Sequence, residues 1–325
     1  MEQRRIERLG RGVGVVGLGT WQLGADWGKV SPQDAHAALE AAIDAGITFF
    51  DTADVYGDGR SERFCGELHA RHLGVLVATK MGRRVEQLPE NYNAAAFREW
   101  NARSRKNLGM GQIDLVQLHC PPDEVYRDDA VFEALDELVR EGHIAAYGVS
   151  VETCKQALLA IDRPHVATVQ IILNCFRLKP LEEVLPAARE AGVGIIARVP
   201  LASGLLSGRY DERTTFSPED HRSYNRHGEA FDVGETFSGV PYETGLAAAR
   251  ELAELVDPGM TLAQFALRWV IDQPGVSTVI PGARNGEQVR QNAAAAGLAP
   301  LRREQLDGVA DVYDRLVREH VHAHW

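Results

Sequence analysis

The sequence lacks long apolar runs and lacks an excess of positive charge. None of its hydrophobic segments approaches the roughly 20 residues that a membrane-spanning helix needs, and no apolar leader segment follows the first residues, MEQRR. Its 35 lysines and arginines are outnumbered by 46 aspartates and glutamates, which gives a net charge of -11. That balance disfavours binding to nucleic acid or to an anionic membrane. We therefore expect a cytoplasmic protein that acts on a small molecule.

Cysteine is also scarce in this chain. Its four cysteines form no C-x-x-C pair and lie far apart, at Cys65, Cys120, Cys154 and Cys175. Such spacing favours reduced, buried thiols over disulfides or a zinc site. Three histidines alternate between residues 320 and 324, where they are expected to form an exposed tail. No metal site is predicted.

The rest of the composition is that of an ordinary globular protein, and its pattern alternates between two periodicities. Short β-type runs begin near Val15, Ile47, Val75, Ile113, Ile144, Val166, Val193 and Val276. Helical periodicity lies between most of them, and strand runs such as VLVATK and GIIARVP are apolar throughout, as in parallel strands buried on both faces. Eight strands alternating with helices predict an α/β protein with a (β/α)8 TIM barrel. No linker divides residues 1–325, so a single domain is expected.

A glycine-rich stretch near the start, RGVGVVGLGTW, matches the G-x-G-x-x-G spacing of a dinucleotide-binding Rossmann fold at Gly12, Gly14 and Gly17. That motif needs a preceding strand and a helix that opens on its last glycine. Only a short polar segment precedes it here, and the next residues are too rich in glycine for a helix. The first clear helix start is Ser31-Pro32, where serine can cap and Asp34 can close a capping box. A Rossmann site is therefore rejected.

One connection is much longer than the others. It runs from Arg209 to Tyr242 and is polar, with aromatic residues at Phe216, Tyr224, Phe231 and Phe237. Loops of this length are usually active-site covers or disordered segments. The aromatic residues favour a cover that meets a ligand.

Ionisable residues end three consecutive strand runs. Asp51 ends ITFFD, Lys80 ends VLVATK and His119 lies at the end of LVQLH, while Tyr56 follows Asp51 in the next loop. Each alone has an ordinary structural explanation, such as a turn cap or a satisfied core histidine. Together they are costly to bury unless they are paired, and neighbouring strand ends lie only about 4.8 Å apart. We therefore expect these four side chains to meet at the carboxyl end of the barrel, where such folds keep their active sites.

This set of side chains is suited to donating a proton. A lysine cation favours the phenolate and is expected to lower the pKa of Tyr56, while Asp51 keeps Lys80 charged and oriented. A neutral His119 can donate a hydrogen bond to a carbonyl oxygen. The predicted chemistry is protonation of an oxygen that becomes negative as hydride reaches the adjacent carbon.

The sequence resembles a known family, the aldo-keto reductases. The resemblance rests on FFDTADVYG, ATK and LVQLHCP, and it extends along nearly the whole chain through GLGTWQLG, GRSE, YGVS, VPLASGLLSGR and IPGARNGEQVRQN. It implies a barrel with an N-terminal hairpin and a long loop after the seventh strand. It also implies that Tyr56 is the general acid, that Lys80 and Asp51 tune it, that His119 orients the carbonyl, and that NADPH supplies hydride.

The resemblance assigns a cofactor site as well, for NADPH with NADH as a possible substitute. The nicotinamide end is expected at Gly19, Thr20, Trp21 and Asp51, with Ser150 and Gln170 on the carboxamide and Arg198 at the stacking position. The pyrophosphate is expected at Pro200, Leu201, Gly204, Leu206, Ser207 and Arg209, and the adenosine phosphate at Gly282, Arg284, Gln288, Gln291 and Asn292. Trp21, Trp27, Tyr56 and His119 are expected to line the substrate mouth.

Three departures from the family pattern, at four positions, stand out. Val151 stands where many members have asparagine, which removes a carboxamide partner. Arg198 stands where an aromatic ring usually stacks, and a guanidinium there adds charge. Gly282 and Gln288 replace cations of the best-known branch, which weakens any inference about coenzyme preference from that branch.

Two other classes of function remain open. The potassium-channel β subunits resemble this family and use NADPH binding chiefly in a regulatory role. A non-redox barrel enzyme, an isomerase or aldolase, would use a strand-end lysine such as Lys80 to form a Schiff base. The retained His119 favours a reductase. Neither the particular carbonyl substrate nor the oligomeric state is predicted.

Overall fold

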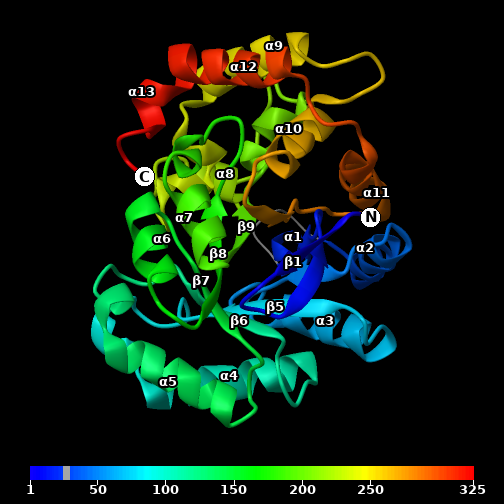
Figure 1. The fold of residues 1–325 in the computed structure, drawn as a ribbon. Coiled ribbons are helices and arrows are strands. Elements are labelled where there is room, and N and C mark those ends of the chain that lie inside the picture. Colours follow the sequence, from blue (N-terminus) through cyan, green and yellow to red (C-terminus); the bar gives the residue numbers. More distant parts are fainter. Residues whose placement is uncertain (25–29) are drawn as a thin grey trace.

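The computed structural model describes residues 1–24 and 30–325, and eight parallel strands form its centre (Figure 1). Each strand pairs with the next along the chain, and parallel bridges from Val16 to Val279 and from Gly19 to Gly282 join the first strand to the last. The strands are β3 (Leu18–Gly19), β4 (Phe49–Asp51), β5 (Leu76–Met81), β6 (Leu115–His119), β7 (Tyr147–Ser150), β8 (Val166–Ile172), β9 (Gly194–Arg198) and β10 (Val276–Val279). The predicted (β/α)8 barrel is confirmed.

Helices surround the barrel on its outside (Figure 1). They are α1 (Trp21–Gly24), α2 (Pro32–Asp44), α3 (Arg60–Arg71), α4 (Ala94–Leu108), α5 (Asp129–Arg140), α6 (Cys154–Ile161), α7 (Val184–Ala191), α8 (His221–Tyr224), α9 (Tyr242–Glu254), α10 (Leu262–Ile271), α11 (Gly286–Ala294), α12 (Arg303–Val312) and α13 (Arg318–Val321). No helix of the described residues is long and apolar enough to cross a membrane.

Local sequence signals fix where several helices begin and end. The Ser31 side chain accepts a hydrogen bond from the backbone N–H of Asp34 and caps α2, as expected. The Asp34 carboxylate, however, accepts from the Ser31 hydroxyl at 2.7 Å and not from the backbone N–H of the cap. Gly192 ends α7 in the left-handed region, with φ 69°, which only glycine adopts at little cost.

A two-stranded antiparallel hairpin, β1 (Gln3–Ile6) and β2 (Arg11–Gly14), closes one end of the barrel. Its Ile6 and Val13 pack against the barrel interior, formed by Phe49, Leu76, Ala78, Leu115, Ile196 and Ile280. The glycine stretch lies in β2 and just before β3, and no helix opens on Gly17, which agrees with rejecting the Rossmann motif. A side chain at Gly17 would meet the Phe49 carbonyl oxygen at 2.9 Å, so close strand packing requires glycine there.

The long connection after β9 is folded against the barrel, and we call residues 209–242 the cover segment. It contains α8 and two short 3-10 turns, Val233–Glu235 and Phe237–Gly239. Phe237 is buried in the main core, and the Asn225 side chain donates to the Thr236 hydroxyl at 3.1 Å. The predicted long loop after the seventh barrel strand is confirmed, and its segments have structure of their own.

Candidate active site

The four predicted catalytic residues meet at the carboxyl ends of β4, β5 and β6. Asp51 and His119 are the last residues of their strands, and Lys80 is the last but one of β5. The Lys80 ammonium donates to Asp51 Oδ1 at 2.5 Å, to the Thr52 carbonyl at 3.0 Å and to the Tyr56 hydroxyl at 3.3 Å. Adjacent parallel strands thus bring together residues that are 24 to 29 positions apart in sequence.

Asp51 is held from its other side by two carboxamides. Its Oδ2 accepts from Gln117 at 3.1 Å and from Gln170 at 2.8 Å. A buried ion pair is stable only when further hydrogen bonds satisfy its remaining atoms, and these glutamines supply them. The sequence reasoning missed Gln117, although a glutamine inside the apolar run LVQLH was a visible signal. Gln170, predicted as a carboxamide ligand, is engaged here with Asp51.

The pKa values of Lys80 and Tyr56 keep both the ammonium and the phenol protonated. Burial alone would lower the pKa of Lys80, but Asp51 and Tyr56 outweigh it, and the pKa lies above its ordinary value. Burial raises the pKa of Tyr56, and Lys80 offsets that effect only in part. The expected lowering of the Tyr56 pKa is therefore wrong, because desolvation of the phenolate outweighs the lysine cation. Tyr56 carries its proton at neutral pH.

His119 is a neutral imidazole in this environment. Burial, followed by the cations Arg83, Lys80 and Arg198, lowers its pKa well below the ordinary range. Its Nδ1 has no hydrogen-bond partner among the residues that the structure describes. The ring lies 6.0 Å from the Tyr56 ring, at 84° to it, so the two polar groups can face a common point.

A cavity of about 550 Å³ runs from these residues to the start of α11. The predicted site residues that line it are Gly19, Thr20, Trp21, Asp51, Tyr56, His119, Ser150, Gln170, Arg198, Pro200, Leu201, Gly204, Ser207, Arg209, Gly282, Arg284, Gln288, Gln291 and Asn292. Leu206 does not line it, because its side chain is fully buried in the main core. Trp27 lies outside the described residues.

The middle of this cavity is lined by left-handed backbone and by a buried arginine. Ala202, Ser203 and Gly204 have φ values of 46°, 53° and 99° in succession, and the N–H groups of Ala202 and Gly204 donate to the Val199 and Leu201 carbonyls at 3.0 and 2.8 Å. Arg222 reaches the cavity from α8, paired with Asp220 at 2.5 Å and donating to the Tyr210 hydroxyl. Sequence reasoning missed Tyr210 and Arg222, because nothing in a polar loop marks which cation turns inward.

Arg284 lies at the far end of the cavity, just before α11. Asn285 caps this helix by accepting from the Gln288 N–H at 3.0 Å, and Gln288 in turn accepts from the Arg284 N–H at 2.9 Å. The Arg284 guanidinium remains 42% exposed, with Asp220 at 3.9 Å. A partly exposed cation beside a helix N-terminus is suited to a phosphate.

Arg198 is not an isolated charge at the inner end of the cavity. Its guanidinium pairs with Glu235 of the cover segment at 2.6 Å and donates to the Val151 carbonyl at 2.8 Å. The positive charge expected from the sequence is thus balanced within the protein. Sequence reasoning missed Glu235, which lies 37 residues further along the chain.

One group of side chains near Arg198 has the donor atoms of a metal site. The sulfur of Cys120 and carboxylate oxygens of Glu152 and Glu235 all lie within 4.8 Å of one another. Each carboxylate already has a cation, however, with Arg83 at 2.7 Å from Glu152 and Arg198 at 2.6 Å from Glu235. This donor set therefore matches guanidinium groups and not a metal ion.

Comparison with known proteins identifies the class that this barrel and site define. The model of the aldo/keto reductase family matches residues 15–314. The aldo-keto reductase YhdN of Bacillus subtilis is 31% identical, with 94% of this chain and 92% of the relative covered. A glycerol dehydrogenase structure from Gluconobacter oxydans is 31% identical with a TM-score of 0.79, covering 97% of this chain and 96% of that chain. The chain belongs to the aldo/keto reductase family and is an oxidoreductase.

Two further relatives bear on the cofactor and on the regulatory alternative. An aldo-keto reductase from Klebsiella pneumoniae, solved in complex with NADPH, is 28% identical with a TM-score of 0.69, covering 96% of both chains. A probable voltage-gated potassium channel subunit beta of Arabidopsis thaliana is also 28% identical, covering 93% of both chains. Both classes named from the sequence thus occur among the relatives.

Proposed function

We propose that this protein reduces an aldehyde or ketone to an alcohol with NADPH, reversibly, in the cytoplasm. The observation that carries the proposal is the chain of contacts from Asp51 through Lys80 to the Tyr56 hydroxyl, beside a neutral His119 at the inner end of the cavity. A buried proton donor next to a polar orienting group is what reduction of a carbonyl requires.

The residues of the cavity fit a dinucleotide. The side chains of Arg209 and Arg222 line the middle of the cavity and suit a pyrophosphate, and Arg284 beside the start of α11 suits a 2'-phosphate. The relative from Klebsiella pneumoniae binds NADPH. These features favour NADPH over NADH, since NADH lacks the 2'-phosphate that Arg284 would bind.

Residues of the protein supply the proton that the carbonyl oxygen needs. Bound NADPH supplies hydride to the carbonyl carbon. His119 donates a hydrogen bond to the carbonyl oxygen and orients it, and Tyr56 transfers its proton to the same oxygen as negative charge develops there. Lys80 then stabilises the phenolate left on Tyr56, and Asp51 holds the ammonium in place throughout.

The Schiff-base alternative does not suit this lysine. A lysine nucleophile must be neutral, whereas the salt bridge to Asp51 holds the pKa of Lys80 above its ordinary value. A regulatory protein, unlike the reductase that we propose, would bind NADPH without reducing a carbonyl.

The proposal is tested by NADPH consumption with a panel of aldehydes and ketones, comparing the wild type with Tyr56→Phe. We expect the variant to lose about 10²–10⁴-fold in kcat, the usual contribution of a general acid, and to bind NADPH as tightly as the wild type in a fluorescence titration. The exposed Leu73→Ala variant is the control and should keep full activity. Tight NADPH binding by the wild type without turnover of any carbonyl would favour the regulatory role.

A further inference from the structure

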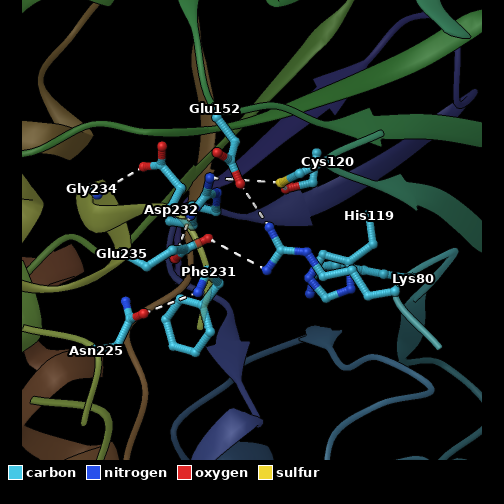
Figure 2. A network of polar contacts seen from close by, with 12 residues as sticks. Lys80, His119, Cys120, Glu152, Asn225, Phe231, Asp232, Gly234 and Glu235 are labelled. Atoms are coloured by element: carbon cyan, nitrogen blue, oxygen red, sulfur yellow. Dashed lines mark hydrogen bonds and ion pairs between the residues drawn. The ribbon is translucent and has the colours of Figure 1, made fainter. Parts of the chain in front are cut away.

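Among the described residues, three ion pairs lie at or beside the inner end of the cavity. They are Lys80–Asp51 at 2.5 Å, Arg83–Glu152 at 2.7 Å and Arg198–Glu235 at 2.6 Å. Two of the carboxylates, Glu152 and Glu235, reach toward the guanidinium of Arg83 close to His119 (Figure 2). The three carboxylates match the three cations in number, so this end of the cavity has no excess of either charge.

The Arg198–Glu235 pair is the one of these three in which both side chains line the cavity. Arg198 is the last residue of β9, and Glu235 comes from the cover segment, so the pair joins the barrel to that segment. Both residues are buried, with 7% and 8% of their surface exposed. Beyond the effect of burial, Arg198 contributes to lowering the pKa of His119, and Glu235 contributes to raising the pKa of Tyr56. Both charges therefore act on the reacting groups.

The oxidised and reduced forms of the coenzyme differ in charge at the nicotinamide ring. Loss of hydride leaves this ring with a positive charge, whereas the ring of NADPH is neutral. Hydride transfer beside Tyr56 and His119 requires the ring at the inner end of the cavity, which Arg198 and Glu235 also line. Charges interact more strongly in a buried site than in water, so an unbalanced guanidinium there would repel the oxidised ring.

The charge of Glu235 has no substitute beside Arg198, because the other two carboxylates already have their own cations. Glu235 also lies 4.0 Å from Arg83, so it keeps a cationic neighbour when Arg198 is replaced. Arg198 in turn donates to the Val151 carbonyl at 2.8 Å, a contact that does not depend on Glu235. Removing one member of the pair therefore leaves a single excess charge, negative without Arg198 and positive without Glu235.

We propose that Glu235 balances the charge of Arg198 toward the nicotinamide and that this ion pair sets the relative affinity of the site for NADP+ and NADPH. Neither residue transfers a proton; both act through their charge on the ring. This inference rests on the proposed reductase function and adds to it the residues that decide which redox form of the coenzyme is held more tightly.

The test measures the Kd of NADP+ and of NADPH by isothermal titration calorimetry at pH 8, above the pKa of about 7 to which burial raises Glu152. We expect Glu235→Gln to raise the ratio of the NADP+ Kd to the NADPH Kd by about tenfold or more, and Arg198→Met to lower this ratio by a similar factor. A tenfold rise corresponds to an increase of about 30 mV in the reduction potential of the bound coenzyme, a two-electron couple. The double variant lacks both charges and should return close to the wild-type ratio.

Glu212→Gln is the matched control for the loss of a carboxylate from the cover segment. Glu212 pairs with Arg250 of α9 at 2.7 Å, and both side chains are exposed. This variant should keep the wild-type ratio of the two Kd values.

The outcomes separate the role of the ion pair from the reductase function. If Glu235→Gln changes both Kd values by the same factor, the pair only holds the cover segment in place and the proposal is overturned. Shifted ratios without turnover of any carbonyl would support the ion pair and overturn the reductase. Failure of the wild type to bind either coenzyme would overturn both. If Arg198→Met fails to fold, the nearly isosteric Glu235→Gln decides, because it keeps the shape and removes only the charge.

Discussion

Lys80, Arg198 and Asp51 are each almost fully buried, and each lies against an opposite charge. Such pairs gain little stability over an apolar core, but removing one partner leaves an unpaired buried charge at a cost of about 3–5 kcal/mol. The pairs therefore fix side-chain positions more than they stabilise the fold. Around Tyr56 this places the Lys80 ammonium 3.3 Å from the hydroxyl.

A prediction at the same scale concerns Arg284 and coenzyme choice. Its guanidinium lies at the far end of the cavity, 42% exposed, and is the cation that we propose for a 2'-phosphate. We expect Arg284→Ala to raise the Kd for NADPH about tenfold or more, in line with the loss of a charge-assisted hydrogen bond, and to leave the Kd for NADH nearly unchanged. Fluorescence titration with both coenzymes measures this. An equal change for the two coenzymes would show that Arg284 does not contact the 2'-phosphate.

Some residues of the candidate site could be predicted from the sequence and others could not. Asp51, Lys80 and His119 were visible because each interrupts an apolar run at a strand end. Arg83 and Glu235 gave no such signal, because their partners come from other loops and only the closed barrel brings them together. The direction of the Tyr56 pKa shift could not be predicted from the sequence either, because it depends on how completely the ring is buried.

At the scale of elements, the cover segment lines the cavity that runs from Tyr56 and His119 to α11. Glu235 pairs with Arg198, and the Glu235 carbonyl accepts from the Ser203 hydroxyl at 3.0 Å beside the left-handed backbone. On the outer side, Trp325 stacks on Arg177 at 3.7 Å and donates to Asp232 at 3.0 Å. Residues 232–235 are therefore tied to the cavity through Glu235 and to Trp325 through Asp232.

Trp325 is expected to hold this segment in place. Trp325→Ala removes a large buried ring and should lower the free energy of unfolding by about 3 kcal/mol, with a higher KM for NADPH as residues 232–235 loosen. Trp325→Phe keeps the stacking and loses only the hydrogen bond to Asp232, so a smaller change of about 1 kcal/mol is expected. Urea unfolding and steady-state kinetics measure both quantities. If Trp325→Ala lowers the free energy of unfolding but leaves the KM for NADPH unchanged, Trp325 stabilises the fold without positioning residues 232–235.

The regular elements were predictable, whereas the cover segment was predictable only as a long loop. Strands such as β9 are apolar along most of their length and helices such as α2 and α5 have clear apolar faces, so local pattern and tertiary packing agree. The turns at residues 221–224 and 233–239 are too short to be stable alone. Their structure comes from contacts with the barrel, which no local pattern records.

At the scale of the whole molecule, the pH dependence of stability follows from carboxyl groups in the interior. Burial raises the pKa of Asp54 and of Glu152 to about 7, against an ordinary value near 4. Between these pH values the folded protein holds protons that the unfolded chain has lost. Stability from these two groups is therefore fully present below about pH 4 and is lost as the pH rises through 7.

Asp54 provides the sharper test, because it is fully buried and neither carboxylate oxygen has a hydrogen-bond partner among the described residues. Burial and then Glu62 raise its pKa, and Arg84 and Arg103 only partly oppose them. Its pKa difference of about three units corresponds to at most about 4 kcal/mol lost between pH 4 and pH 8. Asp54→Asn cannot ionise, so its free energy of unfolding should fall less over this range than that of the wild type.

Urea unfolding at pH 5 and pH 8 measures this difference. We expect Asp54→Asn to be more stable than the wild type at pH 8 and close to it at pH 5, where the wild-type carboxyl is protonated and similar in shape to the amide. Part of the slope should remain, because Glu152 still titrates in the variant. The exposed Asp44→Asn is the control and should keep the wild-type slope. If Asp54→Asn showed the same slope as the wild type, Asp54 would be ionised in the folded protein, with cations Arg84 and Arg103 outweighing its burial.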